Sequence, residues 1–117
     1  FNKIKELVKH STKSVKQKLN FNDRRFCFEI FGYDLMLDQD LNTYLIEVNT
    51  DPGIDYSSPM MYNLLPRMIE DSLRLTIDEV FETEFENGVY NNPFPIENYS
   101  DEENLWDYVC GLNTLNN

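Results

Sequence analysis

The stretch FCFEIFGYDLMLDQDLNTYLIEVN, residues 26–49, is the one around which the chain is organised. Two apolar runs flank the short polar segment DQDLN, a pattern that predicts a β-hairpin. If the chain folds back between Asp40 and Leu41, Asp34 and Glu47 lie equally far from the fold point and face each other. Asn49 lies two residues beyond Glu47 and therefore on the same face of the hairpin.

Two carboxylates and an amide oxygen on one sheet face point to a bound cation. Carboxylates in close proximity repel one another and are costly to remove from water. A hard cation relieves both problems, and a few protein oxygen ligands suit Mg²⁺ that is bound together with phosphates. The sequence therefore predicts a metal site made of Asp34, Glu47 and Asn49.

The remaining residues of this face divide it into a polar end and an apolar end. Gly32 precedes Asp34 by two residues, and a glycine there leaves room for a ligand or another backbone to approach. Met36 follows Asp34 by two residues and is expected to face Leu45. The polar end suits a charged ligand and the apolar end a flat apolar one.

Two other interpretations compete with this magnesium site. A lone Asp or Glu in a strand commonly reaches solvent or forms a salt bridge. In addition, Asp38, Asp40 and Asn42 have the spacing of the first three ligands of an EF-hand. The sixth loop position would be Thr43 instead of glycine, and the flanking segments are strands instead of helices, so we favour a solvated turn.

The hairpin follows a predicted helix over residues 2–19, whose apolar residues recur at helical spacing. A turn at Asn22-Asp23 then leads into the first strand, which we place at about 26–37. That strand is apolar on both faces, which predicts a sheet covered on both sides, with Cys27 as a small core residue. Both cysteines are expected to be reduced thiols.

A second helix is predicted from Met60 to about Phe81, with Pro59 as a favourable opening residue. Pro66 lies inside this apolar stripe, so the helix either begins late, near Leu64, or is kinked. We favour the late start.

Charge is distributed unevenly along the 117 residues, which carry a net charge of −11. Eight of the ten lysines and arginines lie in residues 1–25, whereas residues 82–117 form an acidic, Asn-rich tail. We expect the tail to be partly disordered, with residues 102–110 able to form one short amphipathic turn or a docking segment. The length suits one small domain, and no apolar run is long enough to span a membrane.

The segments FEIFGYDLMLD and YLIEVNTDPG resemble the end of the catalytic domain in the tubulin-tyrosine-ligase-like family. The resemblance is close over residues 26–53 and extends over 2–81. It implies an α+β fold in which residues 1–81 are the C-terminal part of an ATP-grasp domain, an antiparallel β-hairpin flanked by helices. It also implies a ligase that joins an amino acid to tubulin or another acceptor protein. In that chemistry ATP phosphorylates a carboxylate, and an amine attacks the resulting acylphosphate.

Residue roles follow from the same resemblance. Asp34, Glu47 and Asn49 would hold the Mg²⁺ ions that bridge the ATP phosphates, with Glu47 between two metals, and Met36 would line the adenine pocket. No residue is assigned as a catalytic acid, base or nucleophile, and nothing in the sequence pairs with His10.

The family takes its phosphate-binding lysine and most adenine contacts from earlier strands, and the chain contains no GxxxxGK loop. We therefore interpret the chain as part of a longer protein that by itself is inactive and binds ATP weakly.

Two functions remain open. The first is a ligase, with glutamate favoured over glycine or tyrosine as the added amino acid. The second is an inactive module whose basic first helix binds the acidic tails of tubulin. For both, the expected partner is tubulin or microtubules, with no nucleic acid or membrane. The expected location is the cytoplasm, at the cytoskeleton or cilium.

Overall fold

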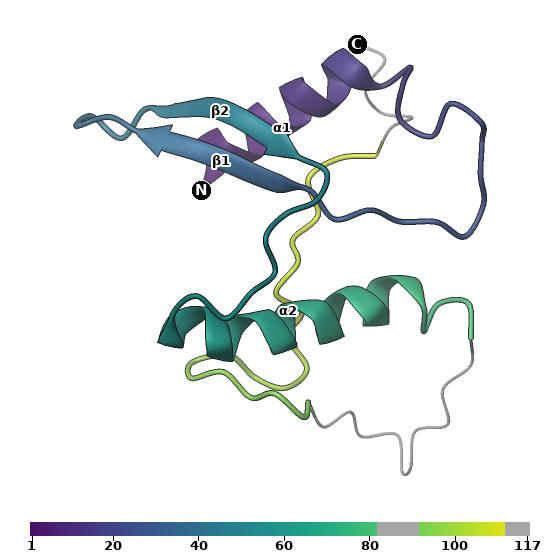
Figure 1. Cartoon of the computed structure of the whole chain (residues 1–117), viewed down its shortest axis with the longest axis vertical. Helices are drawn as coiled ribbons and strands as arrows, with labels where there is room; N and C mark the ends of the chain where they lie inside the picture. The colour runs from purple at the N-terminus through teal and green to yellow at the C-terminus, as the bar shows by residue number, and fades with distance from the viewer. Residues whose placement is uncertain (82–91, 112–117) are drawn as a thin grey trace. The chain divides into compact units, whose positions relative to one another are not determined.

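The computed structural model describes residues 1–81 and 92–111. Two helices and two strands follow one another in the order α1, β1, β2, α2 (Figure 1), which confirms the α+β prediction. The chain divides into two compact units, Phe1–Gly53 together with the segment from Tyr108, and Ile54–Asp107. No helix of the described residues is long and apolar enough to cross a membrane.

The first unit begins with α1 (Asn2–Val15), which is one turn shorter than the predicted helix over 2–19. The helical bonding pattern ends because the Lys16 amide donates to the Lys13 carbonyl three residues back, and Asn20 then adopts a positive φ of 48°. The side chain of Asn20 bonds to both backbone groups of Arg24 (2.9 Å each). These bonds form the predicted turn that leads into the hairpin.

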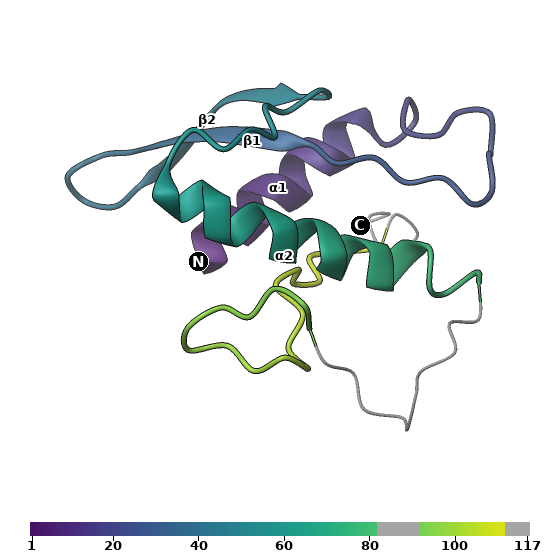
Figure 2. The ribbon, with the colours of Figure 1, turned by 60° about the horizontal axis from the view of Figure 1, so that its bottom comes forward.

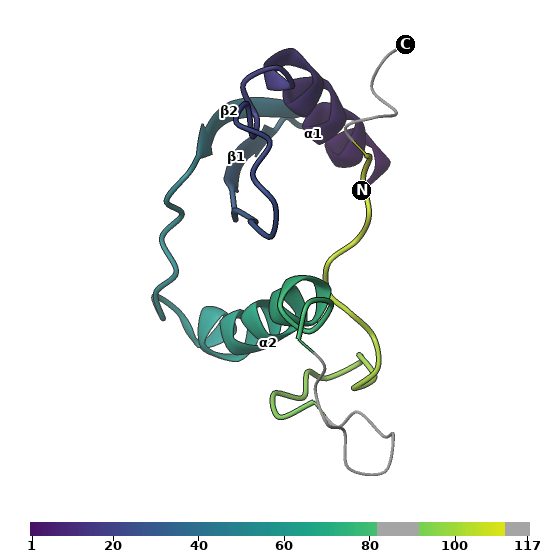
Figure 3. The same ribbon diagram turned by 90° about the vertical axis from the view of Figure 1, so that its right-hand side faces the viewer.

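The strands β1 (Gly32–Leu37) and β2 (Thr43–Asn49) pair in antiparallel fashion and confirm the predicted hairpin. Helix α1 covers one face of this hairpin (Figures 1 and 3). The Tyr33 hydroxyl lies 3.1 Å from the Ser11 hydroxyl of α1, and Lys3 Nζ donates to Asn42 Oδ1 at 3.1 Å. Hydrogen bonds near both ends of the hairpin therefore hold the helix in place.

The first strand is shorter than predicted, because it begins at Gly32 and not near Phe26. Gly32 pairs with Asn49, the last residue of β2, so residues 26–31 have no facing strand within the described part of the chain. They form an extended loop (Figure 2), in which Phe26 is 85% exposed and Cys27 is exposed instead of buried in a core. Both cysteines are free thiols, as expected.

The prediction of a sheet covered on both faces is wrong for the unit that contains the hairpin. Helix α1 covers one face there, and Met36 and Ile46 remain 60% and 58% exposed. A face left open in this way is accessible to a ligand or to another element.

The turn at the tip of the hairpin is organised by Asp38. Its Oδ1 accepts the amides of Asp40 (3.0 Å) and Asn42 (2.8 Å), and its Oδ2 accepts Asn42 Nδ2 and the Tyr44 hydroxyl. Protein donors thus use the carboxylate oxygens that a calcium ion would need, which supports the interpretation of this segment as a turn.

The Asp38 carboxylate makes the hairpin sensitive to acid. The hydrogen bond from the Asn42 side chain, followed by that from the Asn42 backbone, lowers the pKa of Asp38. The resulting stabilisation is therefore present above the ordinary Asp pKa of about 3.9 and is lost as the pH falls through the lower folded-state value. We expect Asp38→Asn to lower the thermal midpoint at pH 6. The gap between variant and wild type should narrow below about pH 4, and a gap independent of pH would contradict the assignment.

The second unit contains α2 (Pro59–Thr76). The Ser58 hydroxyl accepts the Met61 amide at 3.2 Å, and Pro59 occupies the first turn, so the predicted opening is confirmed. The predicted late start near Leu64 is wrong, because the helix runs through Pro66. This well-capped start outweighs the single hydrogen bond that a proline removes. The helix ends at Thr76, before the predicted end near Phe81.

Part of the predicted tail is packed on α2. We call residues 92–107 the strap; they return along α2 in Figure 1, whereas residues 82–91 and 112–117 lie outside the described residues. The indole Nε1 of Trp106 donates to the Met68 carbonyl of α2 at 2.9 Å. The prediction that residues 102–110 contain a docking segment is therefore confirmed.

Candidate functional site

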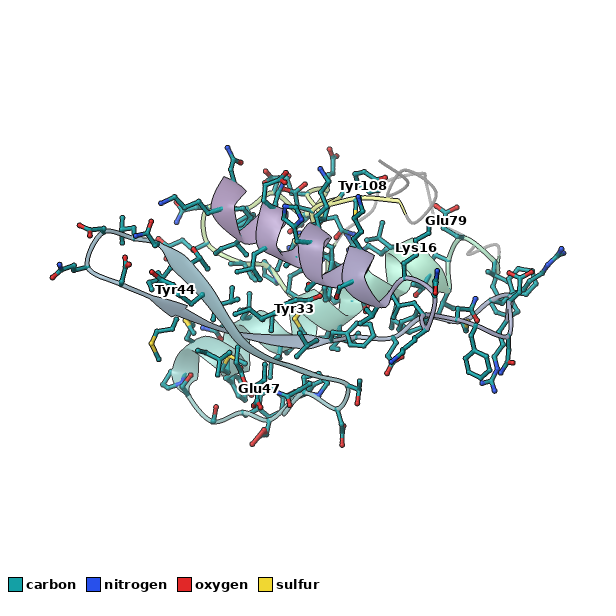
Figure 4. The ribbon with its side chains drawn as sticks, turned by 90° about the horizontal axis from the view of Figure 1, so that it is seen from above. Lys16, Tyr33, Tyr44, Glu47, Glu79 and Tyr108 are labelled. Atoms are coloured by element: carbon teal, nitrogen blue, oxygen red, sulfur yellow. The ribbon has the colours of Figure 1, made fainter. Side chains whose placement is uncertain are left out.

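The strand register brings the predicted site residues together. Asp34 pairs with Glu47 and Gly32 pairs with Asn49, as the fold-back argument predicts. Facing pairs of an antiparallel sheet share a face, so Asp34, Glu47 and Asn49 all project from one side of the hairpin. Figure 4 shows Tyr33 on the side covered by α1 and Glu47 on the opposite side of the hairpin.

A register shift between Asp34 and Leu35 changes the apolar end of this face. Beyond the shift Leu35 pairs with Leu45, and Met36 pairs with Tyr44. The prediction that Met36 faces Leu45 is therefore wrong, because the shift leaves one more residue on β2 than on β1. The neighbour of Met36 is a tyrosine that is 52% exposed.

The three polar side chains make direct contact. Asn49 Nδ2 donates to Asp34 Oδ2 at 3.1 Å and to Glu47 Oε1 at 3.3 Å. One amide nitrogen thus lies between two carboxylates, where its partly positive hydrogens offset their repulsion. The carboxylates are exposed, so a ligand could reach them from solvent.

This donor set fits a magnesium ion. The amide nitrogen of Asn49 stands where a cation would relieve the same repulsion, and rotation of the amide would present its Oδ1 as a third oxygen ligand. The site contains only two carboxylates, and the described residues include no group of three or more His, Cys, Asp or Glu side chains that could hold a metal. A site of two carboxylates and one amide suits Mg²⁺, which keeps several ligands from water or phosphate.

The turn after β2 packs next to the site, where Pro52 lies against Gly32 and beside Asn49. A Cβ atom on Gly32 would lie 2.9 Å from Pro52 Cβ and 3.8 Å from Asn49 Cβ. The gap predicted at this glycine is thus used by the chain itself, and Pro52 packs into it beside Asn49. The sequence Thr50-Asp51-Pro52-Gly53 marks the turn but does not show where it packs.

We expect Gly32→Ala to destabilise the chain by about 1–3 kcal/mol, the usual range for an added methyl group in a close-packed position. The physical reason is the 2.9 Å approach, which forces Pro52 or β1 to move. Urea unfolding would measure the loss. Combining Gly32→Ala with Pro52→Gly should cost less than the sum of the two single changes, and strict additivity would contradict the contact.

Comparison with protein families places this geometry in a known context. The family model described as "Tubulin-tyrosine ligase family" matches residues 1–86, a range that includes α1, the whole hairpin and α2. The chain belongs to the tubulin-tyrosine ligase family. The matched range includes Asp34, Met36, Glu47 and Asn49, and the strap lies beyond it.

Individual relatives carry related names. The chain is 40% identical to tubulin glycylase 3C of Tetrahymena thermophila over 68 residues, which is 58% of the chain and 6% of that protein. It is 39% identical to the probable tubulin polyglutamylase TTLL9 of Bos taurus over 75 residues, 64% of the chain and 16% of that protein. It is 43% identical to the tubulin monoglutamylase TTLL4 of Homo sapiens over 49 residues, 42% of the chain and 4% of that protein.

The chain thus spans less than a fifth of the length of these tubulin-tyrosine ligase family relatives. No solved structure matches the chain significantly.

Proposed function

We propose that this chain forms part of an ATP-dependent carboxylate–amine ligase with an ATP-grasp fold, which adds glutamate to tubulin or another acceptor protein. The observation that carries the proposal is the contact of the Asn49 amide with Asp34 and Glu47 on the open face of the hairpin. Family membership supplies the reaction class, and this oxygen cluster is suited to the metal that such a reaction requires.

The proposed role of the site is to hold Mg²⁺ and ATP. When bound, the metal would neutralise charge on the phosphates and on the transferring phosphoryl group. Asp34 and Glu47 would bind it through carboxylate oxygens, with Glu47 between two ions, and Asn49 would bind through Oδ1. Met36 would contact the adenine, because it is exposed on the same strand face as Asp34.

An incorporation assay tests the reaction and the amino acid together. The relatives include both glycylases and glutamylases, so labelled glutamate, glycine and tyrosine should be compared. The complete gene product would be incubated with microtubules, ATP and Mg²⁺. Glutamate incorporation that requires ATP supports the proposal. Glycine or tyrosine incorporation would refute the choice of glutamate, and no incorporation by folded protein would refute the ligase.

A second candidate function is a tubulin-binding module without turnover at the cytoskeleton or cilium, favoured by the charge of α1. Lys5, Lys9 and Lys13 follow one another at four-residue spacing, and such residues lie on one face of a helix. Lys13 is exposed, and Lys5 and Lys9 are half-buried. A row of cations on a helix face suits an acidic peptide such as a tubulin tail.

The lysine row gives a prediction that both functions share. We expect the triple change Lys5→Gln, Lys9→Gln, Lys13→Gln to weaken microtubule co-sedimentation about tenfold at low salt, because lysine charges at the surface attract an acidic partner over about 10 Å at 0.1 M salt. The matched control is Lys18→Gln, an exposed lysine outside α1. Equal binding by the triple variant, or binding insensitive to salt, would exclude α1 as the contact.

A further inference from the structure

The strap is held by a buried charge cluster on α2. Arg67 Nε donates to both carboxylate oxygens of Asp71, at 3.0 and 3.1 Å, and neither side chain has any exposed surface. Arg74, one turn further along α2, lies 3.4 Å from the same carboxylate. Buried charges persist only where other polar groups satisfy their remaining hydrogen-bonding capacity.

The strap supplies most of those groups for Arg67 through its backbone, and Arg67 Nη1 is left without a hydrogen-bond partner among the described residues. Arg67 Nη2 donates to three carbonyls, those of Ser100 (3.0 Å), Asp101 (3.5 Å) and Glu103. Arg74 Nη1 donates to the Asp101 carbonyl at 3.2 Å, and Asp71 Oδ2 accepts the Leu105 amide at 2.8 Å. The arginines thus bind main-chain oxygens of an acidic segment.

Side chains of the strap fix its register on the helix. Asn104 Nδ2 donates to the Asp71 carbonyl at 2.9 Å, and Trp106 Nε1 donates to the Met68 carbonyl. Asn92, at the other end of the strap, is 6% exposed and donates to Asp71 Oδ1 at 3.4 Å. Asp71 is therefore the point at which both ends of the strap meet α2.

We propose that α2 carries a docking surface for an extended peptide segment, and that the strap occupies it in the same chain as a built-in ligand. The surface consists of Arg67, Met68, Asp71 and Arg74, which recur at helical spacing on one side of α2. The strap lies outside the range that matches the family, so this element is an addition to the matched region. The proposal is independent of ligase activity.

Trp106 is the single tryptophan of the chain and reports directly on the strap. We would measure acrylamide quenching of its fluorescence, and amide exchange at Leu105, in the full chain. The variants are Arg67→Met on the helix and Asn104→Ala on the strap. The matched control is Glu102→Gln, which removes an exposed charge of the strap. Both test variants should raise the quenching constant about twofold and the Leu105 exchange rate at least tenfold, and the control should change neither.

Three outcomes would overturn the docking surface. The first is quenching of wild-type Trp106 equal to that of free tryptophanamide. The second is unchanged Leu105 exchange in both Arg67→Met and Asn104→Ala. The third is release by Glu102→Gln, which would mean that acidic side chains and not main-chain carbonyls hold the strap. If Arg67→Met loses helical circular dichroism, Asn104→Ala decides the result, since it leaves the sequence of α2 intact.

Discussion

Glu47→Gln should reduce ATP-dependent amino-acid incorporation by the complete gene product about 100-fold or more. The change keeps the size of the side chain but removes one of two negative ligands from the proposed metal site, and loss of a metal-binding group commonly has at least this effect. The fold should survive, because Glu47 is exposed and the new amide oxygen can still accept the Asn49 hydrogen bond. Turnover number and circular dichroism would be measured side by side.

The control for Glu47→Gln is Asp40→Asn, which removes an exposed carboxylate from the tip of the same hairpin. It should keep near-normal turnover, so that a general effect of charge is excluded. A fully active Glu47→Gln enzyme would refute its role as a metal ligand. The 117-residue chain itself should bind Mg-ATP more weakly than micromolar; micromolar binding by calorimetry would show that the earlier strands are not required.

Asp71→Ala should have the largest effect on stability, a loss of about 3–5 kcal/mol, because it leaves the buried guanidinium of Arg67 without its counter-charge. It also removes the acceptor for the Leu105 amide and for the Asn92 side chain. The free energy of unfolding would be measured by urea titration. For a small domain, a loss of this size is a large share of its total stability.

Glu79→Gln is the matched control for Asp71→Ala, since it removes an exposed carboxylate just beyond α2. Such surface changes usually alter stability by less than about 0.5 kcal/mol. If Asp71→Ala lost no more stability than Glu79→Gln, Asp71 would have to be solvated in the native protein. That result would also remove the basis of the docking surface for the strap.

Local sequence patterns predicted which helices and strands form, but they placed several of the ends of these elements wrongly. The polar segment between two apolar runs predicted the hairpin, and Pro59 was recognised as a favourable opening residue, although the favoured start of α2 near Leu64 was wrong. The first strand was placed too early, since the apolar residues from Phe26 onward suit a strand but have no partner in the described residues. Strand formation depends on a facing backbone, and a single segment of sequence does not contain that information.

At the candidate site, one strand pairing was predicted correctly and another was not. Counting from the fold point predicted the pairing of Asp34 with Glu47, because antiparallel register is regular between a turn and the first irregularity. The prediction failed at Met36, where the shift after Asp34 replaces Leu45 by Tyr44. Bulges depend on local twist and packing, which leave no residue signature here.

By itself, the sequence determined the α+β class, the hairpin and the meeting of Asp34, Glu47 and Asn49, the proposed oxygen ligands, on one strand face, because each depends on the spacing of residues along the chain. The family resemblance rests on the same local motifs. Only the tertiary structure decided that Pro52 fills the gap at Gly32 and that the acidic strap docks on α2. Those contacts join groups far apart in sequence, and in each case one partner is main chain, whose position is not encoded in the identity of its own side chain.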